Sequence, residues 1–174
     1  DNLLSNNILI NDIKNPNIRT FNDKTYRIYN IKNGRIYSDN VENVAIIDEN
    51  KIIDNISYQQ IQGNLVSANK NICLQKGTPR IKNRFKGRVL SLAQGASGIS
   101  NYYHWLFDLL PKIKLYSEIY NFNELDYLYA GNLQNFQAET LVPLGLDKIK
   151  VIDIANNRHI EADEIICTDH PNYY

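Results

Sequence analysis

The spacing of apolar residues changes near Gly87, and no other feature constrains the fold of this chain as strongly. Before this point, short stretches in which apolar and polar residues alternate are separated by Asn, Asp and Gly, a pattern typical of β-strands and turns. After it, apolar runs of strand length alternate with longer stretches of helical spacing. We therefore expect a β-rich, mostly antiparallel segment over 1–86 and an α/β unit over 87–174.

Two tight turns are expected in the first part. Asn33-Gly34 separates the alternating stretches 25–29 and 35–37. Asn-Gly in this setting indicates a hairpin, because both turn positions need a positive φ. Residues 48–50 separate two further apolar stretches in the same way. Each turn therefore predicts an antiparallel pair of neighbouring strands.

The second part alternates between strands and helices with short connections, which indicates a parallel sheet of the doubly wound, Rossmann-like type. Such sheets bind ligands beyond the carboxyl ends of their strands. This draws attention to a loop of small residues over 95–100, which follows the first of these strands. The expected strands are 88–93, 125–130, 150–154 and 163–167, and the expected helices are 101–120 and 135–144, the second ended by Gly145.

Composition excludes several classes of protein. The 174 residues include 19 Lys and Arg against 19 Asp and Glu, so a general attraction to nucleic acid is not expected. No apolar run approaches the roughly 20 residues that a bilayer crossing needs, and no signal peptide is visible, which predicts a cytoplasmic location. Cys73 and Cys167 lack metal-site spacing; we expect reduced, buried thiols, with one disulfide as the alternative.

The chemistry that stands out is a histidine and an aspartate on one expected helix. His104 and Asp108 are four residues apart, so their side chains can meet. A carboxylate that accepts one imidazole N–H fixes the tautomer and leaves the other nitrogen to take a proton, as a general base must. A structural pair that only holds the loop is the alternative. Two ligands with no third nearby do not make a metal site, so no metal is expected.

Other residues of this helix also have expected structural roles. Ser100 or Asn101 can cap its start. Pro111 predicts either a kink near Leu110 or a helix that restarts at the proline. One stripe at helical spacing is expected to pack on the sheet, and its members are Tyr102, Leu106, Leu109, Ile113, Tyr116 and Tyr120.

The run Asn-Tyr-Tyr-His-Trp-Leu-Phe-Asp-Leu-Leu-Pro-Lys over 101–112 resembles the hallmark segment of glycosyltransferase family 61, which includes bacterial capsular polysaccharide biosynthesis enzymes. The resemblance covers roughly the second half of the chain and, more loosely, the expected hairpins before it. Further features agree in order, namely the strand at 88–92, Glu139-Thr140-Leu141, Leu144-Gly145-Leu146 and the closing stretch 160–166.

The resemblance implies an inverting glycosyltransferase of two Rossmann-like lobes. The amino-terminal lobe would hold the glycan acceptor, and the carboxyl-terminal lobe would hold a nucleotide sugar as co-substrate, with no other cofactor. This chain starts at Asp1, contains no Met and stops at Tyr174. We therefore expect it to be a piece of a longer protein, with the carboxyl-terminal lobe missing.

The chemistry of inverting transfer gives the residues of the segment their expected roles. It needs a base for the acceptor hydroxyl, and His104, oriented by Asp108, is the candidate. Asn101 could hydrogen-bond sugar hydroxyls. Tyr102 and Tyr103, together with Trp105, offer faces on which a sugar ring could stack, although core packing is the alternative for these aromatic residues.

A basic run precedes the segment and contains no acidic residue; its members are Lys76, Arg80, Lys82, Arg84, Lys86 and Arg88. In a strand, the last five would share one face. Arg84 and Lys86 are candidates there for binding substrate: the face could line a cleft for a pyrophosphate or an anionic polymer, or contact the inner face of the membrane. The alternative is a solvated edge strand. Nucleic-acid binding is not expected, because only Phe85 would stack on bases.

A different class of function stays open, which is a non-catalytic carbohydrate-binding or assembly module with the same fold. A hydrolase that uses the same His–Asp pair is less favoured. No convincing nucleophile elbow is present, because Gly95-Ala96-Ser97-Gly98 lacks the required spacing.

Overall fold

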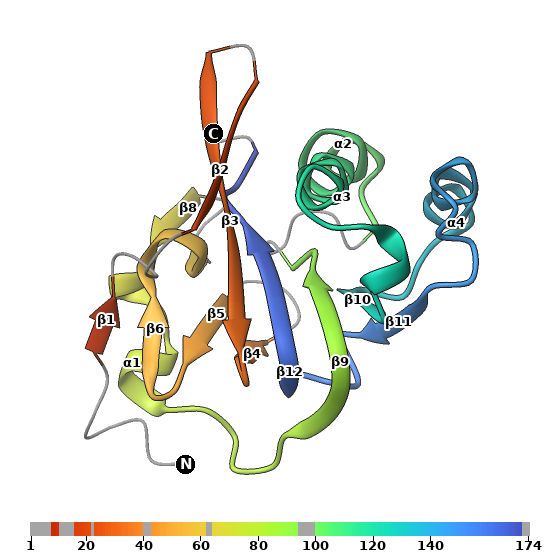
Figure 1. The fold of residues 1–174 in the computed structure, drawn as a ribbon. Helices are drawn as coiled ribbons and strands as arrows, with labels where there is room; N and C mark the ends of the chain where they lie inside the picture. Colours follow the sequence, from red (N-terminus) through yellow and green to blue (C-terminus); the bar gives the residue numbers. More distant parts are fainter. Residues whose placement is uncertain are drawn as a thin grey trace.

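Figure 1 shows the computed structural model, which describes residues 8–10, 16–21, 23–39, 43–61, 64–93 and 100–171. Twelve strands within these ranges join in one mixed sheet. The strands are β1 (Ile8–Ile10), β2 (Asn17–Phe21), β3 (Lys24–Lys32), β4 (Arg35–Ser38), β5 (Asn43–Asp48), β6 (Lys51–Ile53), β7 (Tyr58–Ile61), β8 (Asn64–Ser67), β9 (Asn83–Ser91), β10 (Tyr127–Ala130), β11 (Lys150–Asp153) and β12 (His159–Thr168). The helical elements are η2 (Asp54–Ile56), η3 (Ala68–Lys70), α1 (Cys73–Lys76), α2 (Tyr102–His104), the π-helical turn η4 (Trp105–Leu109), α3 (Leu110–Ser117), η5 (Phe122–Glu124), α4 (Asn135–Leu141) and η6 (Val142–Leu144).

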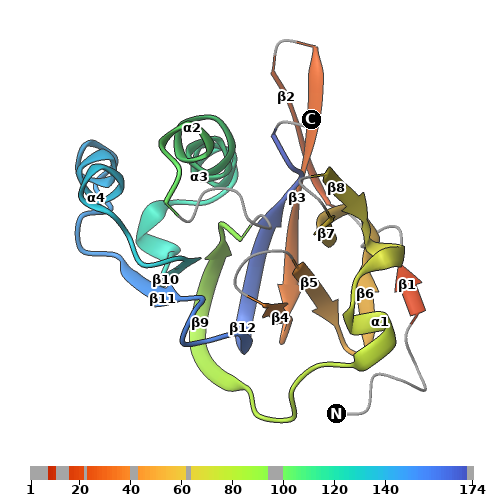
Figure 2. The ribbon, with the colours of Figure 1, turned by 180° about the vertical axis from the view of Figure 1, so that it is seen from behind.

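The strand β12 joins the two parts of the sheet. On one side it runs parallel to β9, with Ile165 opposite Val89, and on the other it runs antiparallel to β3, with Ile165 opposite Ile31. β10 and β11 continue the sheet beyond β9, so four neighbouring strands, β12-β9-β10-β11, are parallel. Figure 2 shows β12 between β9 and β3. The expected parallel sheet is therefore confirmed, and the expected boundary at residue 87 falls inside β9.

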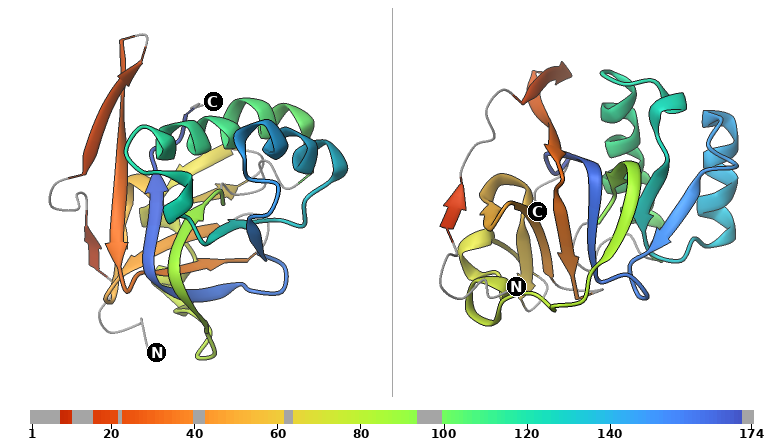
Figure 3. Two further views of the ribbon diagram at one scale, coloured as in Figure 1. Left: turned by 45° about the vertical axis from the view of Figure 1, so that its right-hand side comes forward. Right: turned by 60° about the horizontal axis from the view of Figure 1, so that its bottom comes forward.

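The helices α2, α3 and α4 lie together on one face of the parallel strands (Figure 3, left). Their buried side chains form one core with the strand residues that point to this face, among them Trp105, Leu109, Ile113, Leu141, Leu90 and Leu128. A doubly wound sheet carries helices on both faces. In the described residues the second face is covered instead by antiparallel strands, and its core includes Val89, Tyr129, Ile165, Ile36, Ile46 and Ile53.

Of the two expected hairpins, the second is confirmed and the first is wrong. β5 and β6 pair across the turn at 49–50, with Ile47 opposite Ile52. β3 and β4, in contrast, both pair with β12 and follow one another along it, so Asn33-Gly34 is a local interruption rather than a reversal. Asn33 has a positive φ of 51°, whereas Gly34 does not have one.

A close approach explains why glycine is needed at position 34. A Cβ there would lie 2.8 Å from Cγ2 of Ile31 and 3.1 Å from its carbonyl oxygen. Across the interruption, the carbonyl of Gly34 accepts from the backbone N–H of Ala162, and the backbone N–H of Asn33 donates to the carbonyl of Asp163. The two strands are therefore aligned by their contacts with β12.

The expected long helix forms with a change of pitch. The chain is helical from α2 through η4 to α3, and the N–H of Leu110 donates to the carbonyl of Trp105, an i to i−5 bond. Pro111 lies in the first turn of α3, where its missing N–H is tolerated. The helical backbone continues unbroken into α3, so a π-helical turn is found where a kink or a restart was expected. The helix at 135–144 is also confirmed, since Gly145 ends it with a φ of 71°.

Two further expectations concern the cysteines and membranes. Cys73 and Cys167 are both reduced and buried, as expected, and burial raises the pKa of each thiol to about 12. Among the described residues, no helix combines the length and the apolar character that crossing a bilayer requires. The expected loop over 95–100 lies outside the described residues except for its last residue, Ser100.

Candidate active site

The candidate site lies where the first long helix begins, beyond the carboxyl ends of β9 and β12. Both strands point upwards in Figure 1, and α2 and α3 lie above their ends. They are neighbours in the sheet, although β10 and β11 separate them in sequence, so the strand order reverses between them. In parallel sheets a point of this kind leaves a crevice in which ligands bind.

Asn101 starts the helix. Its side-chain oxygen accepts hydrogen bonds from the backbone N–H groups of Tyr103 (2.9 Å) and His104 (3.4 Å), which confirms the expected cap. The cap fixes the first turn, which carries the histidine. Asn101 remains exposed at the surface of the molecule.

His104 and Asp108 meet as their spacing predicts. Nδ1 of His104 lies 2.6 Å from Oδ2 of Asp108. The Asp108 side chain is 0% exposed and the His104 side chain is 26% exposed, so the carboxylate is buried beneath a ring that reaches the surface. An ionised carboxylate can only accept hydrogen bonds, so when Asp108 is ionised Nδ1 carries a proton, and in the neutral ring Nε2 then carries the lone pair. This arrangement suits a general base.

The buried stripe of the helix differs from the expected one. Tyr102 is exposed and Leu106 is only half-buried, whereas Trp105 and Asp108 are buried. The π-helical turn is the cause, because its wider hydrogen bonding rotates the first turns relative to α3. The observed stripe is Trp105, Asp108, Leu109, Lys112, Ile113 and Tyr116. Two charged residues therefore occupy core positions.

Three exposed aromatic side chains lie on the same turns of the helix as the histidine. Tyr102, Tyr103 and Phe107 are each at least half exposed, and the rings of Tyr103 and Phe107 lie 4.8 Å apart between centroids. The Tyr103 ring also lies 5.6 Å from the imidazole of His104. We call Tyr103 and Phe107 the aromatic platform. Sequence reasoning missed Phe107, although its place four residues after Tyr103 puts the two rings on one helix face.

Trp105 does not belong to this platform. It is fully buried, and its indole N–H donates to the hydroxyl of Thr140 at 2.8 Å. The expectation that it offers a stacking face is therefore wrong. Its structural role is to join the first helix to α4.

Lys112 is the second residue that sequence reasoning missed. It is 3% exposed, and Nζ donates to the carbonyl of Ala93 at 3.3 Å, directly beyond the end of β9. Burial lowers the pKa of Lys112 from 10.5 to about 8, and Cys167, Asp108 and Asp169, in that order, partly oppose this effect. A buried lysine one helical turn beyond a buried aspartate is rare unless the two charges are balanced.

The structure does not bring the basic run to His104. Arg84 and Lys86 are exposed in the first half of β9, and Arg84 lies seven residues before its end, roughly 20 Å away along the strand. Carboxylates from other elements also lie beside the run. Glu161 lies 2.5 Å from Nζ of Lys82 and 3.5 Å from Nε of Arg84, and Arg88 contacts two further glutamates.

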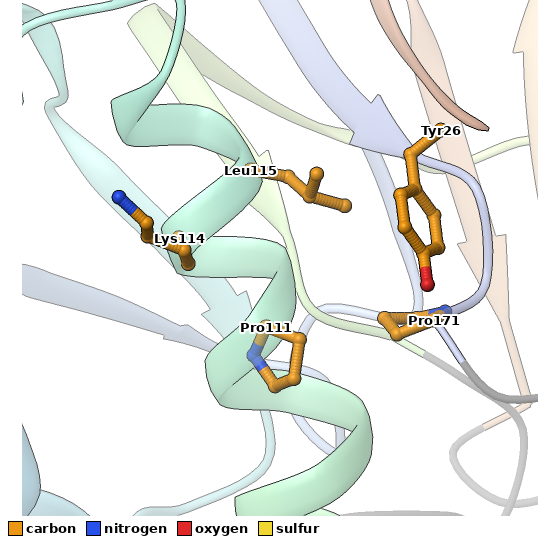
Figure 4. A pocket seen from close by; sticks show the side chains of 5 residues that line it. All are labelled: Tyr26, Pro111, Lys114, Leu115 and Pro171. Carbon is orange, nitrogen blue, oxygen red and sulfur yellow. The ribbon is translucent and has the colours of Figure 1, made fainter. Parts of the chain in front are cut away.

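Two hollows lie along α3, and neither is lined by His104 or Asp108. Figure 4 shows the smaller one, of about 190 Å³, where Pro111 and Leu115 face Tyr26 and Pro171 while Lys114 extends away from the tyrosine. The larger one, of about 730 Å³, lies between α3 and the segment after α4; its apolar lining includes Leu106, Leu110, Phe122, Pro143 and Leu144.

Within the described ranges, no group of three or more His, Cys, Asp or Glu side chains is placed as the ligands of an ion would be. The expectation that no metal takes part stays a prediction.

Comparison with family models, with curated proteins and with solved structures found no match to this chain.

Proposed function

We propose that this chain is the acceptor-binding lobe of an inverting glycosyltransferase, and that His104 is its catalytic base. The observation that carries the proposal is the 2.6 Å contact between Nδ1 of His104 and the buried carboxylate of Asp108, with the ring partly exposed beyond the carboxyl ends of parallel strands. The sequence of this segment, which resembles glycosyltransferase family 61, and the strand order β11-β10-β9-β12 of a Rossmann-like half both support it.

In the proposed reaction, His104 acts on the acceptor hydroxyl. Nε2 takes the hydroxyl proton while the acceptor oxygen forms a bond to the anomeric carbon of the donor sugar. The bond between that carbon and the nucleotide phosphate breaks, and its electron pair leaves with the phosphate. Attack opposite the leaving group inverts the anomeric centre. Asp108 keeps the imidazole in the required tautomer and stabilises the imidazolium that forms.

The acceptor would lie against the aromatic platform. The exposed rings of Tyr103 and Phe107 offer apolar faces that match the C–H face of a pyranose, and the Tyr103 ring lies close to the imidazole. The amide of Asn101 can donate to a sugar hydroxyl while its oxygen caps the helix. Tyr102, whose ring contacts Phe136 of α4 at 5.2 Å, would extend this surface towards α4.

The remaining parts of the proposal concern the donor and the cellular setting. The nucleotide sugar would bind chiefly to a carboxyl-terminal lobe that follows this chain, as the resemblance implies. Arg84 and Lys86 lie at the opposite end of β9 from His104, so they would contact an anionic polymer or membrane surface rather than the pyrophosphate of the donor. The product would be a capsular or other surface polysaccharide, made in the cytoplasm or at the inner face of the membrane.

The proposal can be tested in the full-length protein. We expect His104→Gln to lower glycosyl transfer by about 100-fold or more, the usual scale for losing general-base help. Transfer would be followed as nucleotide release from a panel of UDP-, GDP- and dTDP-sugars, with oligosaccharides from the surface polysaccharide of the source organism as acceptors. His159→Gln is the matched control, because His159 is buried on β12 and contacts the carbonyl of Pro79.

The alternative, a non-catalytic glycan-binding or assembly module, predicts a different result. Transfer would be absent from the wild-type protein, and His104→Gln would leave glycan binding intact. A folded His104→Gln protein that transfers sugar as fast as the wild type would contradict the proposed role of the histidine.

A further inference from the structure

The larger of the two hollows along α3 takes no part in the proposed transfer. We call it the apolar groove. It has a volume of about 730 Å³, and its walls come from η4 and α3 on one side and from η5, α4 and η6 on the other. Along the helix its lining extends from Leu106 to Ser117, a rise of roughly 16 Å. Small-molecule sites in proteins have volumes in this range and are often found between helices.

The three polar side chains in the described lining of the groove already have partners inside the molecule. The Thr140 hydroxyl accepts from the indole N–H of Trp105 and donates to a carbonyl of its own helix. The Ser117 hydroxyl donates to the carbonyl of Lys114, and the Lys114 ammonium pairs with Glu118. The other lining residues are apolar. What the groove offers a ligand is therefore apolar surface, which favours a ligand without hydrogen-bonding groups.

The groove lies next to the surface on which the acceptor sugar is proposed to bind. Tyr102 is 60% exposed, and its ring contacts Phe136 of α4 at 5.2 Å. Leu106, which lines the groove, follows Tyr102 by four residues and lies on the same face of the helix. The aromatic platform occupies the adjoining face. A molecule with a sugar on the platform can therefore extend an apolar chain past Tyr102 into the groove.

We propose that the apolar groove binds the hydrocarbon chain of a glycolipid acceptor, whose sugar lies on the aromatic platform beside His104. The assignment of this ligand as the acceptor rests on the proposed function, whereas the binding of an alkyl chain does not.

The groove suits a hydrocarbon chain better than a polypeptide. An extended peptide would bring backbone N–H and C=O groups for which the described lining side chains have no free partner. A helix of the same length and ~10 Å in diameter would occupy roughly 1,200 Å³, which is more than the groove holds. An alkyl chain is narrower than either and has no group to satisfy.

The test uses hexyl, octyl and decyl maltoside, which share one headgroup and differ only in the chain, each below its critical micelle concentration. They would be titrated into the full-length protein in a calorimeter, with maltose as the reference that lacks a chain. We expect the affinity to rise by about tenfold for every two methylene groups that enter the groove, and maltose to give no saturable signal. An affinity that does not depend on chain length would overturn the inference.

The indole N–H of Trp105 reports where the chain binds, because it is bonded to Thr140 in the wall of the groove. Its ¹H–¹⁵N resonance would be assigned with Trp105→Phe, and we expect it to shift as octyl maltoside saturates the protein. A resonance that does not move during saturable binding would place the chain elsewhere and contradict the inference.

Leu144→Glu puts a carboxylate into the lining at a position that is 38% exposed, where the fold tolerates a charge. We expect this variant to bind octyl maltoside about tenfold more weakly or worse. Val142→Glu is the matched control, because Val142 belongs to the same turn η6, is 58% exposed and lies outside the lining. It should bind like the wild type, and an equal loss in both variants would show that the groove is not the site.

A second variant keeps the inference testable if Leu144→Glu does not fold. Ser117→Trp fills the far end of the groove without adding a charge, so we expect decyl maltoside to bind this variant no more tightly than octyl maltoside does. A full-length protein that binds no alkyl chain, and that Leu144→Glu converts from a dimer to a monomer, would make the groove an interface between copies and overturn the inference.

Two further outcomes separate this inference from the proposed function. Unchanged transfer by His104→Gln would overturn the proposed function alone, because alkyl binding is measured without turnover and His104 does not line the groove. If alkyl chains bind as expected but an octyl glycoside is no better an acceptor than the methyl glycoside of the same sugar, the ligand of the groove is not the acceptor and the inference fails.

Discussion

At the scale of single residues, the buried ammonium of Lys112 gives the stability of the fold a pH dependence. Burial lowers the pKa of Lys112 from 10.5 to about 8, so between these values the unfolded chain holds more protons than the folded one. Stability contributed by this site therefore rises as the pH rises from 8 towards 10.5. Below pH 8 the cost of burying the ammonium is fully present.

The measurement compares urea unfolding of the wild type and Lys112→Met from pH 7 to pH 10. We expect the wild type to gain stability relative to the variant above pH 8, by up to about 1.4 kcal/mol for each pH unit. Near pH 7 the difference in stability between the two proteins should change little with pH. If the unfolding free energies of the wild type and Lys112→Met change in parallel up to pH 10, the Lys112 ammonium is not buried in the way described.

The residues of the site differ in how far the sequence could predict them. The four-residue spacing of His104 and Asp108 is a local property of a helix, so their contact could be predicted. The burial of Lys112 could not, because lysine is almost always exposed and the expected stripe was built from apolar residues. The π-helical turn before Pro111, which the sequence does not signal, also changes which residues of the first turns are buried, and Trp105 and Asp108 are among them.

At the scale of elements, the first turn of the long helix offers a way to separate capping from substrate contact. The side-chain oxygen of Asn101 caps the helix, and its amide nitrogen is the group proposed to meet a sugar hydroxyl. Asn101→Asp keeps an accepting oxygen but loses the amide donor. Asn101→Ala loses both groups.

We expect Asn101→Asp to keep the stability of the wild type within about 0.5 kcal/mol, and Asn101→Ala to lose about 1 kcal/mol. Both should raise KM for the glycan acceptor if the amide contacts it. The measurements are urea unfolding and initial rates with varied acceptor. A KM that rises only in the alanine variant would assign Asn101 to capping alone.

The interruption at Asn33-Gly34 shows where local signals fail for strands. The dipeptide predicts a hairpin when its two strands pair with each other. Here β12 is long enough to pair with β3 along one half and with β4 along the other, so the two strands stay in line. The turn at 49–50 could be predicted correctly, because β5 and β6 do pair with each other.

At the scale of the whole molecule, the alternation of strands and helices after residue 87 was sufficient to predict a parallel sheet. It was not sufficient to predict what covers the second face, because apolar residues on both faces of a strand do not say whether a helix or a sheet packs there. The strands of the first part supply that cover, as the core around Val89 and Ile165 shows. The fold is therefore built from both parts of the chain.

This dependence predicts that the two parts open together. Ile165 pairs with Val89 of the parallel strands and with Ile31 of the antiparallel ones, and Arg88 on β9 forms an ion pair with Glu164 at 2.6 Å. Any opening that frees β12 from one neighbour exposes apolar surface on the other.

In native-state hydrogen exchange of the full-length protein, we expect the central amides of β3, β9 and β12 to share one free energy of opening and one urea dependence. The amides of β11, which pairs only with β10 among the described strands, are the comparison and should exchange through smaller local openings. If the β3 amides exchange at a lower free energy than those of β9, with a smaller urea dependence, the first part unfolds by itself and the shared sheet does not make the molecule one cooperative unit.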